Sequence, residues 1–190
     1  MRNPLAQHLI LPALALVGAT AAFVLLRGPI DRSRSVSLHV ASEPHTIWLF
    51  AIASTIATVP MALFMVGWFI PALQLPAWFT VIFMAALAGQ LIAAWIPHNT
   101  GWRAAVHQFC AYLMAYLMVP LVVFILFSPA LPLWAKAIIG VILAWMIFSL
   151  ALYHLSAKAK LQFLLYQSGY VASFYMVLLV ATYAPHVNFT

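Results

Sequence analysis

The chain has 190 residues, of which 67% are hydrophobic and only 5% are charged, and its mean hydropathy is +1.08. Soluble globular proteins carry about 25% charged residues, so no water-soluble fold could bury this much apolar surface. The formal net charge of +6 comes from eight Lys and Arg residues, which are too sparse for a nucleic-acid surface. Composition therefore excludes a soluble fold and a nucleic-acid partner, and it favours an integral membrane protein.

Six stretches are long and apolar enough to cross a bilayer as helices, which takes about 20 residues each. In chain order they are 9–26, 47–70, 76–96, 104–127, 133–153 and 161–184. The first stretch follows Arg2 and resembles a signal peptide, but it is long enough to span, so we expect it to be retained. Each helix closes its backbone hydrogen bonds internally. We predict an all-α membrane protein, a six-transmembrane-helix bundle with short loops, in which residues 1–190 form a single integral membrane domain.

Basic residues are unevenly divided between the two ends of this predicted bundle. The loops after the first, third and fifth spans contain Arg27, Arg32, Arg34, Arg103, Lys158 and Lys160, whereas the other end has only Arg2 and Lys136. We call the first of these ends, with the loops 27–46, 97–103 and 154–160, the odd-loop end. Because positive charge is retained on the cytoplasmic side, we expect the odd-loop end to be cytoplasmic and both termini to be external, in a plasma (inner) membrane.

Polar residues within the spans are concentrated in the half of the bundle nearest the odd-loop end. The members of this set are Thr20, Ser54, Thr55, Thr58, Gln90, His107, Gln108, Tyr112, Ser149, Gln162, Tyr166, Gln167, Ser168, Tyr170 and Ser173. Polar side chains are unfavourable in hydrocarbon unless they find partners. We therefore expect them to turn inward, to meet one another, and to form a polar cavity that opens at the odd-loop end.

The same end collects most of the titratable groups. Five of the seven histidines and both acidic residues of the chain, Asp31 and Glu43, fall in or beside the odd loops. We predict that Glu43 and His107 form a hydrogen-bonded pair that fixes the first loop to the bundle. The candidate ligand-binding or structural cluster consists of Ser42, Glu43, His45, Gln90, His98, Arg103, His107, Gln108 and Gln167.

Three interpretations of this cluster remain open. The polar groups could cap helices and cross-link loops, or Arg103 and His98 could bind the phosphate of an anionic lipid headgroup. Alternatively, Glu43, His45, His98 and His107 could be ligands of zinc or another transition ion, although their spacing matches no compact metal motif.

Short motifs flank the second, third and fourth spans. Ala41-Ser42-Glu43-Pro44-His45 enters the second span, and Ile96-Pro97 is followed by Gly101 and then by His107 at the start of the fourth. This pattern resembles a family of uncharacterised six-span membrane proteins related to the FRAG, DRAM and Sfk group. The resemblance implies a six-span fold over nearly the whole chain and no established reaction, and it directs attention to Ser42, Glu43, Pro97 and His107.

No catalytic residue is predicted. The spans contain no acidic residue for a proton-coupled carrier and no paired histidines at mid-depth for a b-type haem, and we expect no resident cofactor. The favoured hypothesis is a non-enzymatic membrane protein that binds a lipid headgroup, such as an anionic one, or a partner subunit at the polar cavity. The alternatives are a membrane-embedded metal-dependent enzyme that uses the Glu and His cluster, and an accessory subunit of a larger membrane complex.

Overall fold

The computed structural model describes residues 4–26, 30–41, 44–96 and 101–186. Within these ranges the secondary structure is helical and no strand occurs. Six helices are long and apolar enough to cross a membrane, and they comprise Leu5–Leu26, His45–Leu73, Ala77–Trp95, Trp102–Leu126, Leu133–Leu155 and Phe163–Tyr183. The predicted all-α, six-helix fold is thus confirmed, and the chain is a multi-pass membrane protein.

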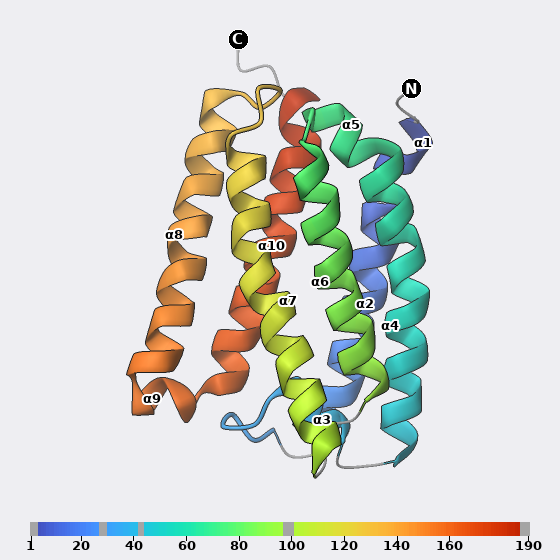
Figure 1. Ribbon diagram of the computed structural model, residues 1–190, viewed down its shortest axis with the longest axis vertical. Coiled ribbons are helices and arrows are strands. Elements are labelled where there is room, and N and C mark those ends of the chain that lie inside the picture. The colour runs from blue at the N-terminus through green and yellow to red at the C-terminus, as the bar shows by residue number, and fades with distance from the viewer. Residues whose placement is uncertain (1–3, 27–29, 42–43, 97–100, 187–190) are drawn as a thin grey trace.

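The helices form one elongated bundle (Figure 1). The spanning helices are α2 (Ile10–Leu26), α4 (Pro44–Phe64), α6 (Ala77–Trp95), α7 (Trp102–Leu126), α8 (Leu133–Leu155) and α10 (Phe163–Tyr183). Four short helices lie at the ends: α1 (Pro4–Gln7), α3 (Val36–Val40), α5 (Ile70–Leu73) and α9 (Ala157–Lys160). Helices α3 and α9 lie at the odd-loop end, whereas α1, α5 and the end of α10 lie at the opposite end, which we call the termini end.

The second span is longer than the sequence predicts. Helix α4 continues through Pro60 and passes into a π-helical turn at Met65–Phe69 and then into α5. The helix stops at Gln74, whose left-handed φ of 54° reverses the chain, and the Leu75 amide donates to the Ile70 carbonyl. A left-handed residue is a common way to end a helix. Residues 71–73, predicted to be loop, therefore belong to the span.

The core at the termini end is apolar and aromatic. Phe64, Phe69 and Phe79 are fully buried there, with ring centroids 5.2 Å apart for Phe64 and Phe69 and 6.3 Å apart for Phe69 and Phe79. Aromatic rings at such separations pack favourably. This end of the bundle is densely packed, and the two cavities described below lie nearer the middle and the odd-loop end.

Most Ser and Thr hydroxyls in the spans bond to their own helix. The donor and acceptor are four residues apart in each case: Thr20 to Leu16, Thr55 to Ala51, Thr58 to Ser54, Ser149 to Trp145, Ser173 to Gly169 and Thr182 to Leu178. The expectation that these polar groups meet one another across the bundle is therefore wrong for most of the Ser and Thr hydroxyls, although the Thr55 hydroxyl also accepts from Nε1 of Trp95 on α6 at 3.0 Å. A short side chain reaches the preceding turn of its own helix more readily than another helix.

Candidate ligand-binding site

A cavity of about 100 Å³ lies between α7, α8 and α10, in the half of the bundle nearest the odd-loop end. We call it the tyrosine cavity, because five tyrosines belong to its lining. The lining residues are Ala111, Tyr112, Met114, Ala115, Tyr116, Met118, Ser149, Leu150, Tyr153, His154, Phe163, Tyr166, Gln167, Tyr170 and Val171. None of them is Lys, Arg, Asp or Glu. The cavity thus combines apolar walls with neutral hydroxyl, amide and imidazole groups.

Helical spacing brings these groups to one place. Tyr112 and Tyr116 are four residues apart on α7, and Tyr166 and Tyr170 are four apart on α10. Residues four apart share a helix face. Each pair therefore presents two phenol rings to the space between the helices, and Tyr153 on α8 completes the set.

Hydrogen bonds connect the helices around the cavity. The Tyr116 hydroxyl on α7 lies 2.5 Å from Nε2 of His154 on α8, and the two rings are stacked with centroids 6.2 Å apart. Also between α7 and α8, the hydroxyls of Tyr112 and Tyr153 are 3.4 Å apart. The Tyr170 hydroxyl on α10 donates to the Ala115 carbonyl of α7 at 2.5 Å. These bonds fix the positions of the polar groups that a ligand would meet.

The rim of the cavity reaches the outer surface of the bundle. Tyr116 is 47% exposed, and His154 is exposed one residue before the end of α8. Because both residues belong to spanning helices, their exposed surfaces face the membrane. His154 lies near the depth of the lipid headgroups, where aromatic side chains with a polar group are favoured.

The first loop packs against the start of α10, beside the cavity. The Leu164 amide donates to the Arg32 carbonyl at 3.0 Å, and the Val36 amide donates to Oε1 of Gln167 at 3.1 Å. Ser35 caps α3 by accepting from the Leu38 amide. Gln167 therefore does two things: it lines the tyrosine cavity and it holds the first loop.

A second local network stabilises the beginning of that loop. Both the amide and the hydroxyl of Ser33 donate to Oδ1 of Asp31, at 2.9 Å and 2.6 Å. These two hydrogen bonds lower the pKa of Asp31 below its ordinary value of 3.8, with a smaller contribution from the charge of Arg34. The exposed Asp31 carboxylate thus stabilises a turn and does not take part in the cavity.

The residues of the predicted site that the structure describes lie in several different places. Gln167 lines the tyrosine cavity. The Gln108 amide donates at 3.3 Å to the hydroxyl of Tyr112, which also lines this cavity. His107 is buried, and its Nδ1 lies 2.7 Å from the Ile96 carbonyl, so it holds the end of α6 to α7. Arg103 is exposed over the ring of Trp102, at 5.7 Å.

The remaining predictions are tested only in part. His45 is exposed at the start of α4, whereas Ser42, Glu43, Pro97 and His98 lie outside the described residues. The predicted Glu43–His107 pair and the proposed metal ligands therefore stay predictions. In the part of the chain that the structure describes, no three His, Cys, Asp or Glu residues come together as a metal site would require.

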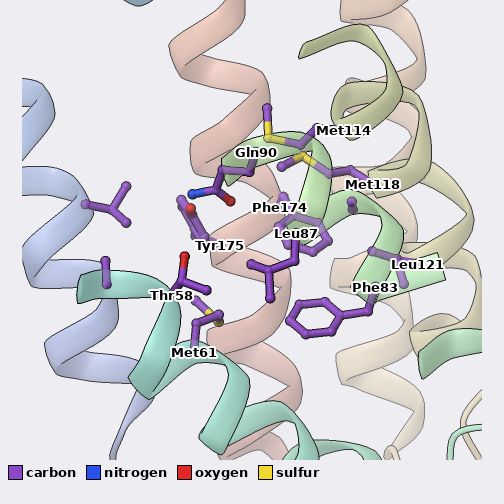
Figure 2. A pocket seen from close by; sticks show the side chains of 13 residues that line it. Thr58, Met61, Phe83, Leu87, Gln90, Met114, Met118, Leu121, Phe174 and Tyr175 are labelled. Carbon is purple, nitrogen blue, oxygen red and sulfur yellow. The ribbon is translucent and has the colours of Figure 1, made fainter. Parts of the chain in front are cut away.

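A smaller cavity of about 30 Å³ lies at the middle of the bundle (Figure 2). We call it the inner cavity. It is lined by Gln90, a member of the predicted ligand-binding cluster. Its walls come from α2, α4, α6, α7 and α10, and they are Val17, Ala57, Thr58, Met61, Phe83, Ala86, Leu87, Gln90, Met114, Met118, Leu121, Phe174 and Tyr175. Met114 and Met118 line both cavities.

Sequence reasoning missed Tyr116, Tyr153 and the role of His154. The available signal was the four-residue spacing of tyrosines on the fourth and sixth spans.

Comparisons of the chain with protein-family models, with curated proteins and with solved structures found no match. The resemblance to the FRAG, DRAM and Sfk group accordingly stays a prediction, and the function has to be argued from the site.

Proposed function

We propose that this multi-pass membrane protein binds the neutral polar end of a membrane lipid in the tyrosine cavity. The observation that carries the proposal is the lining: five phenol rings, one imidazole and one carboxamide at the end of an apolar enclosure. Ligand sites generally combine apolar walls with a few convergent polar groups. Hydroxyl and imidazole groups suit a ligand with carbonyl or hydroxyl oxygens.

The absence of charge in the lining favours a neutral head over a phosphate. Phosphate recognition generally uses Arg or Lys donors, and the lining contains neither. Arg103, the predicted phosphate ligand, is in the first turn of α7, nine residues before Tyr112. At a rise of about 1.5 Å per residue this separates the two along the helix by more than a side chain spans.

The position of the rim supports entry from the membrane. Tyr116 and His154 are exposed on spanning helices, so a lipid that diffuses in the bilayer can present its head to them laterally. Its chain can then stay in contact with the exposed apolar surface of α8, which includes Phe148 and Leu155. An amphipathic ligand therefore needs no aqueous route to reach the site.

Photo-crosslinking tests this proposal directly. The purified protein is placed in vesicles that contain either a diazirine-bearing diacylglycerol, which is neutral, or a diazirine-bearing phosphatidylglycerol, which is anionic. We expect the diacylglycerol to label peptides of α7, α8 and α10, with competition by unlabelled diacylglycerol. Labelling spread evenly over all six helices, or confined to the anionic probe, would overturn the proposal.

Variants of the rim sharpen the test. Tyr116→Phe and His154→Ala each remove one hydrogen-bonding group, and a neutral hydrogen bond contributes about 1 kcal/mol, equivalent to roughly fivefold in affinity. We expect labelling by diacylglycerol to fall by about that factor. Tyr183→Phe, at the termini end of α10, is the matched control and is expected to leave labelling unchanged.

We also propose that the odd-loop end faces the cytoplasm of a plasma (inner) membrane. The support is the distribution of basic residues, six at this end against two at the other, together with the positive-inside rule. Reporter fusions after Lys160 and after Thr190 should show cytoplasmic and external activity, respectively. The opposite result would invert the orientation without affecting the cavity.

A further inference from the structure

Three polar side chains from different helices face the inner cavity. They are Thr58 of α4, Gln90 of α6 and Tyr175 of α10, and the other lining residues are apolar. Figure 2 shows the Gln90 amide and the oxygens of Thr58 and Tyr175 on the same side of the cavity. All three lie well inside their spans, at a depth where hydrocarbon surrounds the bundle.

These groups need a hydrogen-bonding partner. Among the described residues, no hydrogen bond joins the Gln90 amide or the Tyr175 hydroxyl to another protein group, and both residues line the cavity. The Thr58 hydroxyl donates to the Ser54 carbonyl at 2.8 Å, so its lone pairs can still accept. An amide and a phenol at mid-membrane depth are unfavourable without partners.

Water is the partner that fits. A cavity holds a water molecule when it has about 10–15 Å³ of free space and two to four polar partners. The inner cavity has about 30 Å³ and offers two amide donors, two hydroxyl groups and an amide oxygen. Its volume suits one or two water molecules and excludes a lipid head.

Met114 and Met118 separate this cavity from the tyrosine cavity. Both line the two cavities, so their thioether side chains border both. Methionine is unbranched and adopts many conformations at little cost. The α7 backbone behind them packs closely against α6, since a Cβ at Gly89 would lie 3.0 Å from the Cys110 carbonyl oxygen and 3.7 Å from the Met114 nitrogen. The side chains can therefore move while the helix stays in place.

We propose that water enters the bundle through the tyrosine cavity, passes Met114 and Met118, and binds at Thr58, Gln90 and Tyr175. The protein then contains a hydrated half-path from the odd-loop end to the middle of the membrane, with the two methionines as its constriction. This inference uses the geometry of the tyrosine cavity but does not depend on which lipid that cavity binds.

Hydroxyl-radical footprinting of the protein in lipid nanodiscs tests the proposal, because radicals formed from bound water oxidise the side chains beside it. Met61 lines the inner cavity and is 7% exposed, whereas Met84 on α6 is 49% exposed toward lipid. We expect Met61 to be oxidised faster than Met84, which reverses the order that exposure alone gives. Equal rates, or faster oxidation of Met84, would overturn the water site.

Two sets of variants test separately the groups that bind water and the route by which water enters. Gln90→Leu should lower Met61 oxidation severalfold, and Tyr175→Phe provides an independent reading if the first variant does not fold. After rapid mixing with oxygen-18 water, the double variant Met114→Ala and Met118→Ala should incorporate the label at Met61 faster than the wild type. Met176→Ala, at a position 52% exposed on α10, is the control for loss of a methionine.

If exchange at Met61 is the same in the wild type and in the double variant, water reaches the inner cavity elsewhere and the proposed route is wrong. A failure of the diacylglycerol crosslinking with intact footprinting would remove the lipid proposal and leave the hydrated path. Successful crosslinking with failed footprinting would contradict only the hydrated path. The two proposals are thus distinguished by independent measurements.

Discussion

The Tyr116 hydroxyl of α7 and Nε2 of His154 of α8 lie 2.5 Å apart, with their rings stacked at 13°. The two residues are 38 positions apart in the sequence, and they form the membrane-facing rim of the tyrosine cavity. Because one side chain comes from each helix, this contact couples the α7–α8 pairing to the shape of the cavity.

Removal of this bond should weaken the pairing of α7 and α8 measurably. Interhelical hydrogen bonds in membrane proteins contribute about 0.6 kcal/mol on average. We expect a double-mutant cycle of Tyr116→Phe and His154→Ala to give a coupling energy of about 0.5–1.5 kcal/mol. The measurement is denaturant unfolding in mixed micelles, followed by tryptophan fluorescence. Strictly additive single variants would show that the contact contributes nothing to stability.

The helices could be predicted from the sequence because hydrocarbon leaves the backbone no alternative. Composition located all six spans within a few residues, and the fifth begins at residue 133 as predicted. The end of the second span was misplaced because the helix continues past residue 70 through Pro71 to Leu73, and a proline more often marks the end of a helix.

The site was harder to predict because it depends on side-chain conformation and helix rotation. Gln90 and Gln167 were both recognised as polar, yet they line different cavities. His107 holds the Ile96 carbonyl at the end of α6 through its Nδ1, a contact that the sequence does not indicate. The position of a residue within its span predicts its depth in the membrane, but it does not specify which neighbour the side chain contacts.

Ser128→Ala should destabilise the termini end. The Ser128 hydroxyl is buried and donates to the Leu73 carbonyl at 2.6 Å, and its oxygen accepts from the Ala130 amide at 3.2 Å. Leu73 is the last residue of α5, so its carbonyl lies among those that a helix cannot satisfy internally. We expect the free energy of unfolding, measured by thermal or denaturant unfolding, to fall by about 1–3 kcal/mol.

Ser173→Ala is the control for this prediction. The Ser173 hydroxyl donates to the Gly169 carbonyl within α10, and that carbonyl also accepts the regular backbone bond of the helix. Ser173→Ala should therefore lower the free energy of unfolding by less than Ser128→Ala does. Equal losses would show that the Leu73 carbonyl has another partner available.

Gly89→Ala should strain the contact between α6 and α7. A Cβ at this position would lie 3.0 Å from the Cys110 carbonyl oxygen, and a helix backbone cannot move aside as a flexible side chain can. Overpacking of this kind costs about 1–3 kcal/mol. Gly140→Ala on α8 meets nothing within 4 Å and should be neutral or stabilising by up to about 1 kcal/mol. The comparison of their melting temperatures checks both expectations.

Gln167→Leu should release the first loop from α10. The substitution removes the acceptor of the Val36 amide, while the bond between the Leu164 amide and the Arg32 carbonyl remains. We expect faster hydrogen–deuterium exchange in the peptide that contains α3, by roughly fivefold for the loss of about 1 kcal/mol. Gln108→Leu is the matched control, because Gln108 contacts Tyr112. An unchanged exchange rate at Val36 would mean that the loop is held by other contacts.

Ser33→Ala should raise the pKa of Asp31 toward its ordinary value of 3.8, since the hydroxyl of Ser33 is the largest cause of the lowering. A carboxyl with a lowered pKa in the folded state favours that state when it is ionised. The contribution is therefore complete above 3.8 and is lost as the pH falls through the lower, folded-state pKa of Asp31. Carbon-13 NMR can follow this titration, because the chain has only two acidic side chains. Identical titration curves in the wild type and in Ser33→Ala would contradict the assigned cause, whereas Ser33→Thr, which keeps the hydroxyl, should retain the lowered pKa.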